Sequence, residues 1–123
     1  MIATREDVQI LQELDKVYRP GVVARKFANS RRLSESVESG DFFDKYSPDS
    51  DERFFVNEIA TFFELLGMLW SKGLVDEELV LEWSAVGFYW KKVGAVLVMA
   101  REVYDAPQLW VYFEALAVAQ MGS

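Results

Sequence analysis

"FFELLGMLWSKG", residues 62–73, is an apolar run that carries one acidic residue, Glu64. The chain nearly repeats it as "YFEALAVAQMGS", residues 112–123, with Glu114 in the matching position. At about 100° per residue, the large apolar side chains of each run share one side of a helix and the glutamate lies nearly opposite. Both runs therefore predict helices. Each glutamate can either face water or form an ion pair inside a bundle.

Capping signals predict where the helices of the first half begin and end. Thr4 and Asp7 stand three residues apart, a variant of the capping box with Asp in place of Glu, and predict a helix that Pro20 ends. A thinner apolar stripe predicts a second helix over residues 22–39. Residues 41–51 predict a loop or a turn. We expect the two phenylalanines of this segment to pack it onto the core.

The third predicted helix has the clearest limits. Asp49 or Ser50 can cap its start. It should run to about Ser71, where Gly73 ends it. Asp76 then caps a fourth helix, because it precedes two glutamates that suit the N-terminal dipole.

Two outcomes are open for the fourth helix: it continues to Tyr104 or bends near Gly87. Residues 105–107 end it, and Pro107 suits the first turn of a last helix. No stretch alternates with the period of a strand for long. The sequence therefore predicts an all-α fold, an up-and-down bundle of five or six helices.

Polar and aromatic residues divide the chain unevenly. Polar N-terminal helices are expected over residues 1–53 and aromatic-rich core helices over residues 54–123. No linker rich in Pro, Gly and Ser separates the two parts. We therefore expect one domain, residues 1–123, which is an ordinary domain length.

The composition excludes several kinds of chemistry. The chain has no cysteine and no histidine, so disulfides, thiolate chemistry and the commonest general base and zinc ligand are excluded. A net charge of −7 disfavours broad binding to nucleic acid. The one basic cluster, Arg25, Lys26, Arg31 and Arg32, is either a solvated helix face or a contact for nucleic acid or an acidic partner.

The sequence predicts no membrane span. Its start lacks the basic residues and apolar stretch of a signal peptide. The best membrane candidate, residues 83–100, is interrupted by Lys91 and Lys92 and falls short of roughly 20 clean apolar residues. We therefore expect a cytoplasmic protein.

Arg101 lies on the same helical stripe as apolar residues such as Trp90 and Leu97. A buried arginine needs partners, and its fork suits carboxylates. We therefore expect Arg101 to pair with Glu64, Glu114 or both inside the bundle, in a structural rather than a catalytic role.

Other constellations fit known sites poorly. Two glutamates on two helices suggest a di-iron centre, but that centre needs histidines. Residues 41–52 are acidic but lack the order of a calcium loop. No phosphate-binding or nucleophile-elbow motif occurs. We expect no catalytic residues, no metal and no cofactor.

Aromatic residues are the main candidates for contact with a partner. Phe88, Tyr89 and Trp90 point in three directions from one helix, so one core cannot easily hold all of them, and Tyr89 is expected at an edge. The candidate residues for an interface or a pocket are Trp83, Phe88, Tyr89, Trp90 and Trp110.

The segments "FELLGMLWSKGLVDEELV", "YWKKVGAVLVMAR" and "LWVYFEALA" resemble an uncharacterised bacterial family known as a domain of unknown function. The resemblance covers about residues 54–120. It implies an all-α structure and supplies no reaction; some relatives carry an N-terminal membrane helix, which this chain lacks, and have been loosely linked to phage defence. The matching positions are Phe63, Glu64, Gly73, Asp76, Trp90, Arg101, Phe113, Glu114 and Leu116.

Three functions are consistent with these observations. The first is a non-enzymatic module that binds a protein partner or a second copy of the chain. The second is a small-ligand binder that uses a pocket lined by Trp83, Trp90 and Trp110, with the Glu and Arg residues as polar groups. The third is a regulator that binds nucleic acid through residues 25–32. The sequence identifies no ligand.

Overall fold

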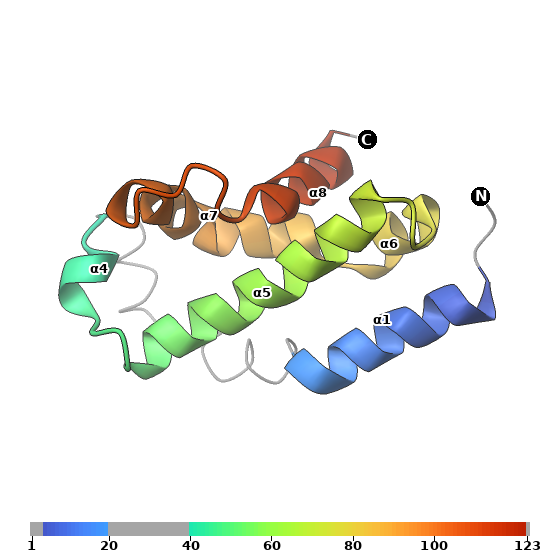
Figure 1. Cartoon of the computed structure of the whole chain (residues 1–123), viewed down its shortest axis with the longest axis horizontal. Helices are drawn as coiled ribbons and strands as arrows, with labels where there is room; N and C mark the ends of the chain where they lie inside the picture. The colour runs from blue at the N-terminus through green and yellow to red at the C-terminus, as the bar shows by residue number, and fades with distance from the viewer. Residues whose placement is uncertain (1–3, 20–39, 123) are drawn as a thin grey trace.

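Six helices form the described part of the chain, residues 4–19 and 40–122, in the computed structural model (Figure 1), and those ranges contain no strand. The prediction of an all-α bundle of five or six helices is confirmed. The helices are α1 (Arg5–Tyr18), α4 (Phe42–Lys45), α5 (Asp51–Ser71), α6 (Glu77–Trp83), α7 (Val86–Val103) and α8 (Val111–Met121).

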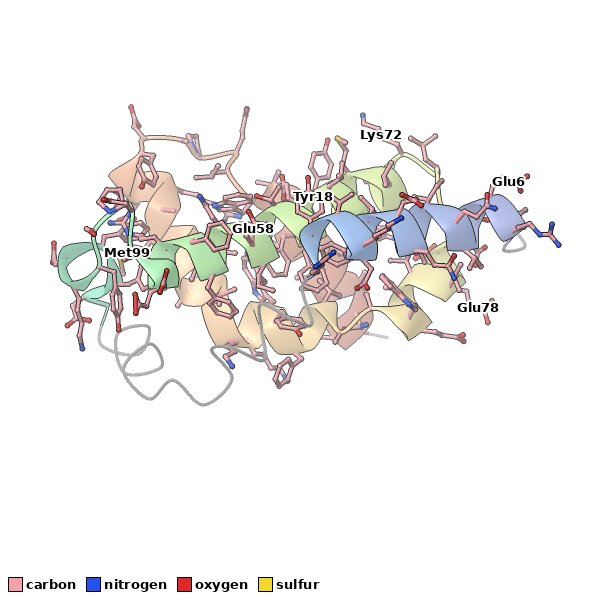
Figure 2. All side chains as sticks on the ribbon, turned by 90° about the horizontal axis from the view of Figure 1, so that it is seen from below. Glu6, Tyr18, Glu58, Lys72, Glu78 and Met99 are labelled. Atoms are coloured by element: carbon pink, nitrogen blue, oxygen red, sulfur yellow. The ribbon has the colours of Figure 1, made fainter. Side chains whose placement is uncertain are left out.

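The long helices α1, α5, α7 and α8 alternate in direction along the chain (Figure 1), as expected of an up-and-down bundle. The most extensive contact joins α5 to α8, and α8 also packs on α7. Helix α1 lies along α5, where the Tyr18 ring meets Phe62 at 6.2 Å. The short helix α4 and Met99 lie at one end of the molecule, and Glu6 and Glu78 lie at the other (Figure 2).

Three predicted helix starts are confirmed by their caps. Thr4 and Asp7 form the reciprocal capping box of α1, with bonds of 2.8 and 3.2 Å between each backbone N–H and the other side chain. Ser50, rather than Asp49, caps α5, and the Asp76 carboxylate accepts the Leu79 N–H at 2.9 Å to cap α6.

Helix α5 ends as the sequence predicts. Gly73 adopts a φ of 70°, which glycine tolerates without a Cβ clash. Its N–H donates to the carbonyl of Trp70, and the Leu74 N–H donates to the carbonyl of Leu69. This pair of bonds is a Schellman motif, which satisfies the last carbonyls of the helix.

The last two helices agree with the prediction in part. Of the two outcomes open for the fourth helix, the break near Gly87 is the one found, whereas the start of the last helix differs. The chain breaks between α6 and α7 at Ser84 and Ala85, just before the predicted bend. Helix α8 begins at Val111, so the expectation that Pro107 lies in its first turn is wrong. Residues 104–110 form turns instead, because Asp105 and Trp110 adopt positive φ angles of 52° and 63° that interrupt a helix.

Some predictions lie outside the described residues: the helix over residues 22–39, the basic cluster, and Pro20 as the residue that ends the first helix. The described part of that first helix, α1, ends at Tyr18. Residues 41–51 contain the short helix α4 as well as turns. Phe42 packs into the core with only 1% of its surface exposed, as expected, and Phe43 is partly buried.

The core is built mainly from α5, α7 and α8. The Phe113 ring stacks on Phe63 at 5.0 Å, and Trp90 meets Phe113 edge-on at 5.1 Å. Each fully buried large side chain contributes roughly 1.5–3 kcal/mol. Other fully buried members include Phe55, Ile59, Phe62, Leu66, Val80, Val86 and Leu116.

Among the described residues, α5 is the one helix whose length and mean hydropathy of 1.2 would permit a membrane crossing. The sequence had pointed to residues 83–100 instead, but that segment contains the helix break at Ser84 and Ala85. Of the apolar window in α5, 44% is buried inside the bundle, which is what a central core helix also shows.

Gly67 allows α5 and α8 to approach each other closely. A Cβ atom at Gly67 would collide with the backbone carbonyl of Tyr112. At Gly87 a Cβ would meet only the side chains of Met121 and Gln120, at 2.9 and 3.0 Å. The first obstacle is rigid backbone. The second consists of side chains, of which Met121 can rotate away while Gln120 is held by a hydrogen bond from the Gly87 N–H.

We expect Gly67→Ala to lower the free energy of unfolding by about 1–3 kcal/mol, since the two helices must separate to admit the methyl group. Gly87→Ala is the comparison variant and should cost less than Gly67→Ala, because its methyl group displaces side chains and not a helix backbone. Chemical denaturation of both variants measures the difference. Equal stability of Gly67→Ala and the parent would show that α5 and α8 are not in close backbone contact.

Candidate functional site

The three predicted ionic residues meet where α8 begins, each from a different helix. Arg101 of α7 places Nη2 3.0 Å from Oε1 of Glu114 in α8. Glu64 of α5 does not join this ion pair. Its Oε1 accepts a hydrogen bond of 2.8 Å from the backbone N–H of Phe113. The structure therefore brings the three residues together but gives the two glutamates different tasks.

Arg101 ties the start of α8 to the turn before it. Its Nε–H donates to the carbonyl of Leu109 at 2.7 Å. The side chains of Arg101 and Glu114 are 17% and 39% exposed, so their ion pair is only partly buried. Nη2 of Arg101 is itself buried and is not aligned for a hydrogen bond, so it meets Glu114 as a charge contact. The pair joins α7 to α8.

Glu64 caps a helix to which it does not belong. The residue before α8, Trp110, has a left-handed backbone and its side chain makes no capping bond. The Phe113 N–H is one of the groups that a helix start leaves without a partner, and an N-cap side chain normally accepts it. Glu64 supplies that acceptor from α5, and its negative charge suits the helix dipole.

The pKa of Glu64 is raised above its ordinary 4.5. Burial is the main cause, because it disfavours the charged carboxylate. The backbone N–H groups of Phe113 and Tyr112 and the charge of Arg101 oppose this effect but do not cancel it.

Gln120 makes structural contacts that the sequence does not predict. From the far end of α8 its Nε2 donates to the carbonyls of Leu81 and Ser84, at 2.8 and 2.6 Å. Its Oε1 accepts the Gly87 N–H at 2.7 Å. One amide thus serves the end of α6 and the start of α7. A lone amide in an apolar helix is the signal that could have indicated it.

Arg53 was also missed. Its three nitrogens donate to the carbonyls of Tyr46 and Phe43 and to the hydroxyl of Tyr104, at 3.0, 3.1 and 3.1 Å. Its Cζ lies 4.5 Å from the centre of the Phe43 ring. A cation in the first turn of a helix interacts unfavourably with the helix dipole. The position of Arg53 in the sequence was therefore a signal that its side chain binds groups outside its own helix.

The aromatic candidates do not form one pocket. Trp83 lines a hollow of about 270 Å³ with Phe62, Phe63 and Tyr89, here called the Trp83 hollow. Trp110 lines another, of about 420 Å³, here called the Trp110 hollow. Trp90 covers Gly94 and packs on Phe113.

The exposed aromatic of the Phe88–Trp90 group is Phe88, not Tyr89. Phe88 is 64% exposed, whereas Tyr89 is partly buried against Phe63 at 5.2 Å. Burial raises the pKa of the Tyr89 hydroxyl, and the charge of Asp15 adds to this shift. Within residues 4–19 and 40–122, no three acidic side chains gather to form a metal site.

The profile of the family described as Domain of unknown function (DUF4760) matches residues 1–119. The chain belongs to the DUF4760 family. This confirms the resemblance seen over residues 54–120 and extends it to nearly the whole chain. No curated protein and no solved structure matches. The match does not bear on membrane anchoring or phage defence, which stay expectations from the resemblance.

We expect Glu64→Ala to lower the free energy of unfolding by about 1 kcal/mol, the usual cost of losing an N-cap acceptor. Glu64→Gln keeps an oxygen for the Phe113 N–H and should cost less. Glu58→Gln, on the same helix (Figure 2), is the control for loss of charge. Thermal melts that rank Glu64→Gln below Glu64→Ala would contradict the capping role.

The pH dependence of the same variants has a defined sign. Because the pKa of Glu64 is higher in the folded chain than its ordinary 4.5, the folded state binds this proton more tightly. The contribution of Glu64 to the free energy of unfolding of the parent is therefore fully present below about pH 4.5. It is lost as pH rises through the pKa of the folded state. When the free energy of unfolding is measured from acid to neutral pH, the stability of Glu64→Gln should increase relative to that of the parent.

We expect Arg101→Met to cost roughly 1–3 kcal/mol, since it frees the Leu109 carbonyl and leaves Glu114 without its cation. Glu114→Gln should cost less, because Glu114 is the more exposed partner. Chemical denaturation ranks the two variants. If Arg101→Met is as stable as the parent, the ion pair between Arg101 and Glu114 has no structural role.

Proposed function

We propose that this DUF4760 protein is a non-enzymatic helical module that pairs with a second copy of itself through the surface around Phe88. The observation that supports this most directly is the exposure of Phe88, 64%, and of Trp83, 43%. Large aromatic side chains in contact with water are typical of the centres of protein interfaces.

The same surface offers both a projecting ring and a recess. The Phe88 ring meets Tyr89 edge-on at 5.3 Å, and Tyr89 lines the Trp83 hollow. Ring and recess are therefore neighbours. In a two-fold dimer each surface must complement itself, and here each Phe88 can enter the Trp83 hollow of the other copy.

The polar side chains inside the bundle support a non-enzymatic role. Glu64, Arg101 and Gln120 are each engaged with backbone groups at helix ends or turns. Such bonds hold the architecture and leave these groups committed to it. A cytoplasmic location is part of the proposal, because a chain without cysteine needs no oxidising compartment.

We expect the parent to form a dimer whose fraction rises with concentration, measured by analytical ultracentrifugation. Phe88→Glu should raise the dissociation constant at least tenfold, because it would replace the aromatic ring with a carboxylate and bring that charge toward Asp15, which also lines the Trp83 hollow. Val118→Glu, at a position 59% exposed on α8, is the matched control and should leave the dimer intact.

Two results would overturn the proposal. A parent that stays monomeric up to millimolar concentration has no second copy as its partner. A dimer that dissociates in Val118→Glu but not in Phe88→Glu uses another surface.

A further inference from the structure

The Trp110 hollow, about 420 Å³, opens between α4, α5, α7 and the turn residues 104–110. Its volume lies within the range of roughly 300–1,000 Å³ that small-molecule sites occupy. The side chains that line it are mostly apolar and come from segments far apart in the sequence. They include Phe42, Val56, Leu97, Leu109 and Trp110.

Arg53 is the only charged side chain among the described residues that line this hollow. Three of the five N–H groups of its guanidinium donate to neutral acceptors, which leaves one N–H on each Nη nitrogen. No ion pair joins Arg53 to a carboxylate within residues 4–19 and 40–122. A fixed cation therefore stands beside an apolar recess with donors to spare.

The cation is held in one orientation. The carbonyls of Tyr46 and Phe43 anchor two of its nitrogens, and the Phe43 ring lies 4.5 Å from Cζ. The Tyr104 hydroxyl accepts the third bond and keeps its own hydrogen for donation. Asn57 also lines the hollow. Arg53, Tyr104 and Asn57 thus supply polar groups to the lining of an otherwise apolar recess.

We propose that the Trp110 hollow binds an amphipathic anion, a carboxylate on a medium-length alkyl chain. The carboxylate meets the free N–H groups of Arg53 and the Tyr104 hydroxyl. The alkyl chain lies among Val56, Leu97 and Leu109. A guanidinium binds a carboxylate through two parallel hydrogen bonds, and the apolar lining contributes in proportion to the alkyl surface it covers.

The net charge of −7 does not prevent this binding. At physiological ionic strength charges are screened over about 8 Å, so Arg53, at the recess, outweighs distant carboxylates. The site is also separate from the proposed dimer surface. Ala100, which lines the hollow, lies roughly 18 Å along α7 from Phe88 at a rise of 1.5 Å per residue.

The test uses three ligands with the same alkyl chain and different head groups. Calorimetric titration of the full chain with octanoate, octan-1-ol and octylammonium measures each affinity. We expect octanoate to bind at least tenfold more tightly than octan-1-ol, and octylammonium to bind more weakly still. Equal affinities for octanoate and octan-1-ol, or no octanoate binding at millimolar concentration, would overturn the proposal.

Two variants locate the site. Ala106→Phe should fill the hollow and weaken octanoate binding at least tenfold, whereas Ala115→Phe, at an exposed position of α8, should not change it. Arg53→Gln should reduce the affinity for octanoate to that for octan-1-ol. Because Arg53 also anchors α4, a melting curve checks that this variant folds. If Arg53→Gln does not fold, the comparison of Ala106→Phe with Ala115→Phe and the series of three ligands still test the proposal. Octanoate binding that survives Ala106→Phe would place the ligand elsewhere.

Discussion

The close contact between α5 and α8 is the constraint on which the rest of the bundle depends. Gly67 lets the backbone of α8 approach at Tyr112, and that approach brings Phe113 onto Phe63. It also brings the start of α8 within reach of Glu64. Once α8 lies there, its far end presents Gln120 to the junction of α6 and α7. Glu64 and Gln120 thus serve helix ends that the contact between α5 and α8 brings within their reach.

Helix limits set by local chemistry could be predicted from the sequence. The caps at Thr4, Ser50 and Asp76 and the end at Gly73 each depend on residues within a few positions of one another. The start of α8 could not be predicted in this way. Pro107 is compatible with a first turn, but the backbone turns at Asp105 and Trp110 are held by Arg101 and Glu64 from other helices.

The candidate site was predicted in part for the same reason. A helical wheel places Arg101 among apolar residues, which correctly implies an acidic partner, and Glu114 is that partner. Glu64 and Gln120 bind backbone groups of other helices, and periodicity carries no information about a backbone partner. The exposure of neighbouring aromatic residues also depends on tertiary packing, so Phe88, and not Tyr89, is the most exposed of the three.

The apolar character of α8 on nearly all its sides has a consequence for folding accuracy. Glu114 is its only charged residue, so burial alone would reward several rotations of the helix about its axis almost equally. Directional contacts at Glu64, Gly67 and Gln120 are satisfied in a single rotation. These contacts therefore select one rotation of an apolar helix about its axis. A sequence that lost them would keep its helix content but would populate several packing arrangements of α8.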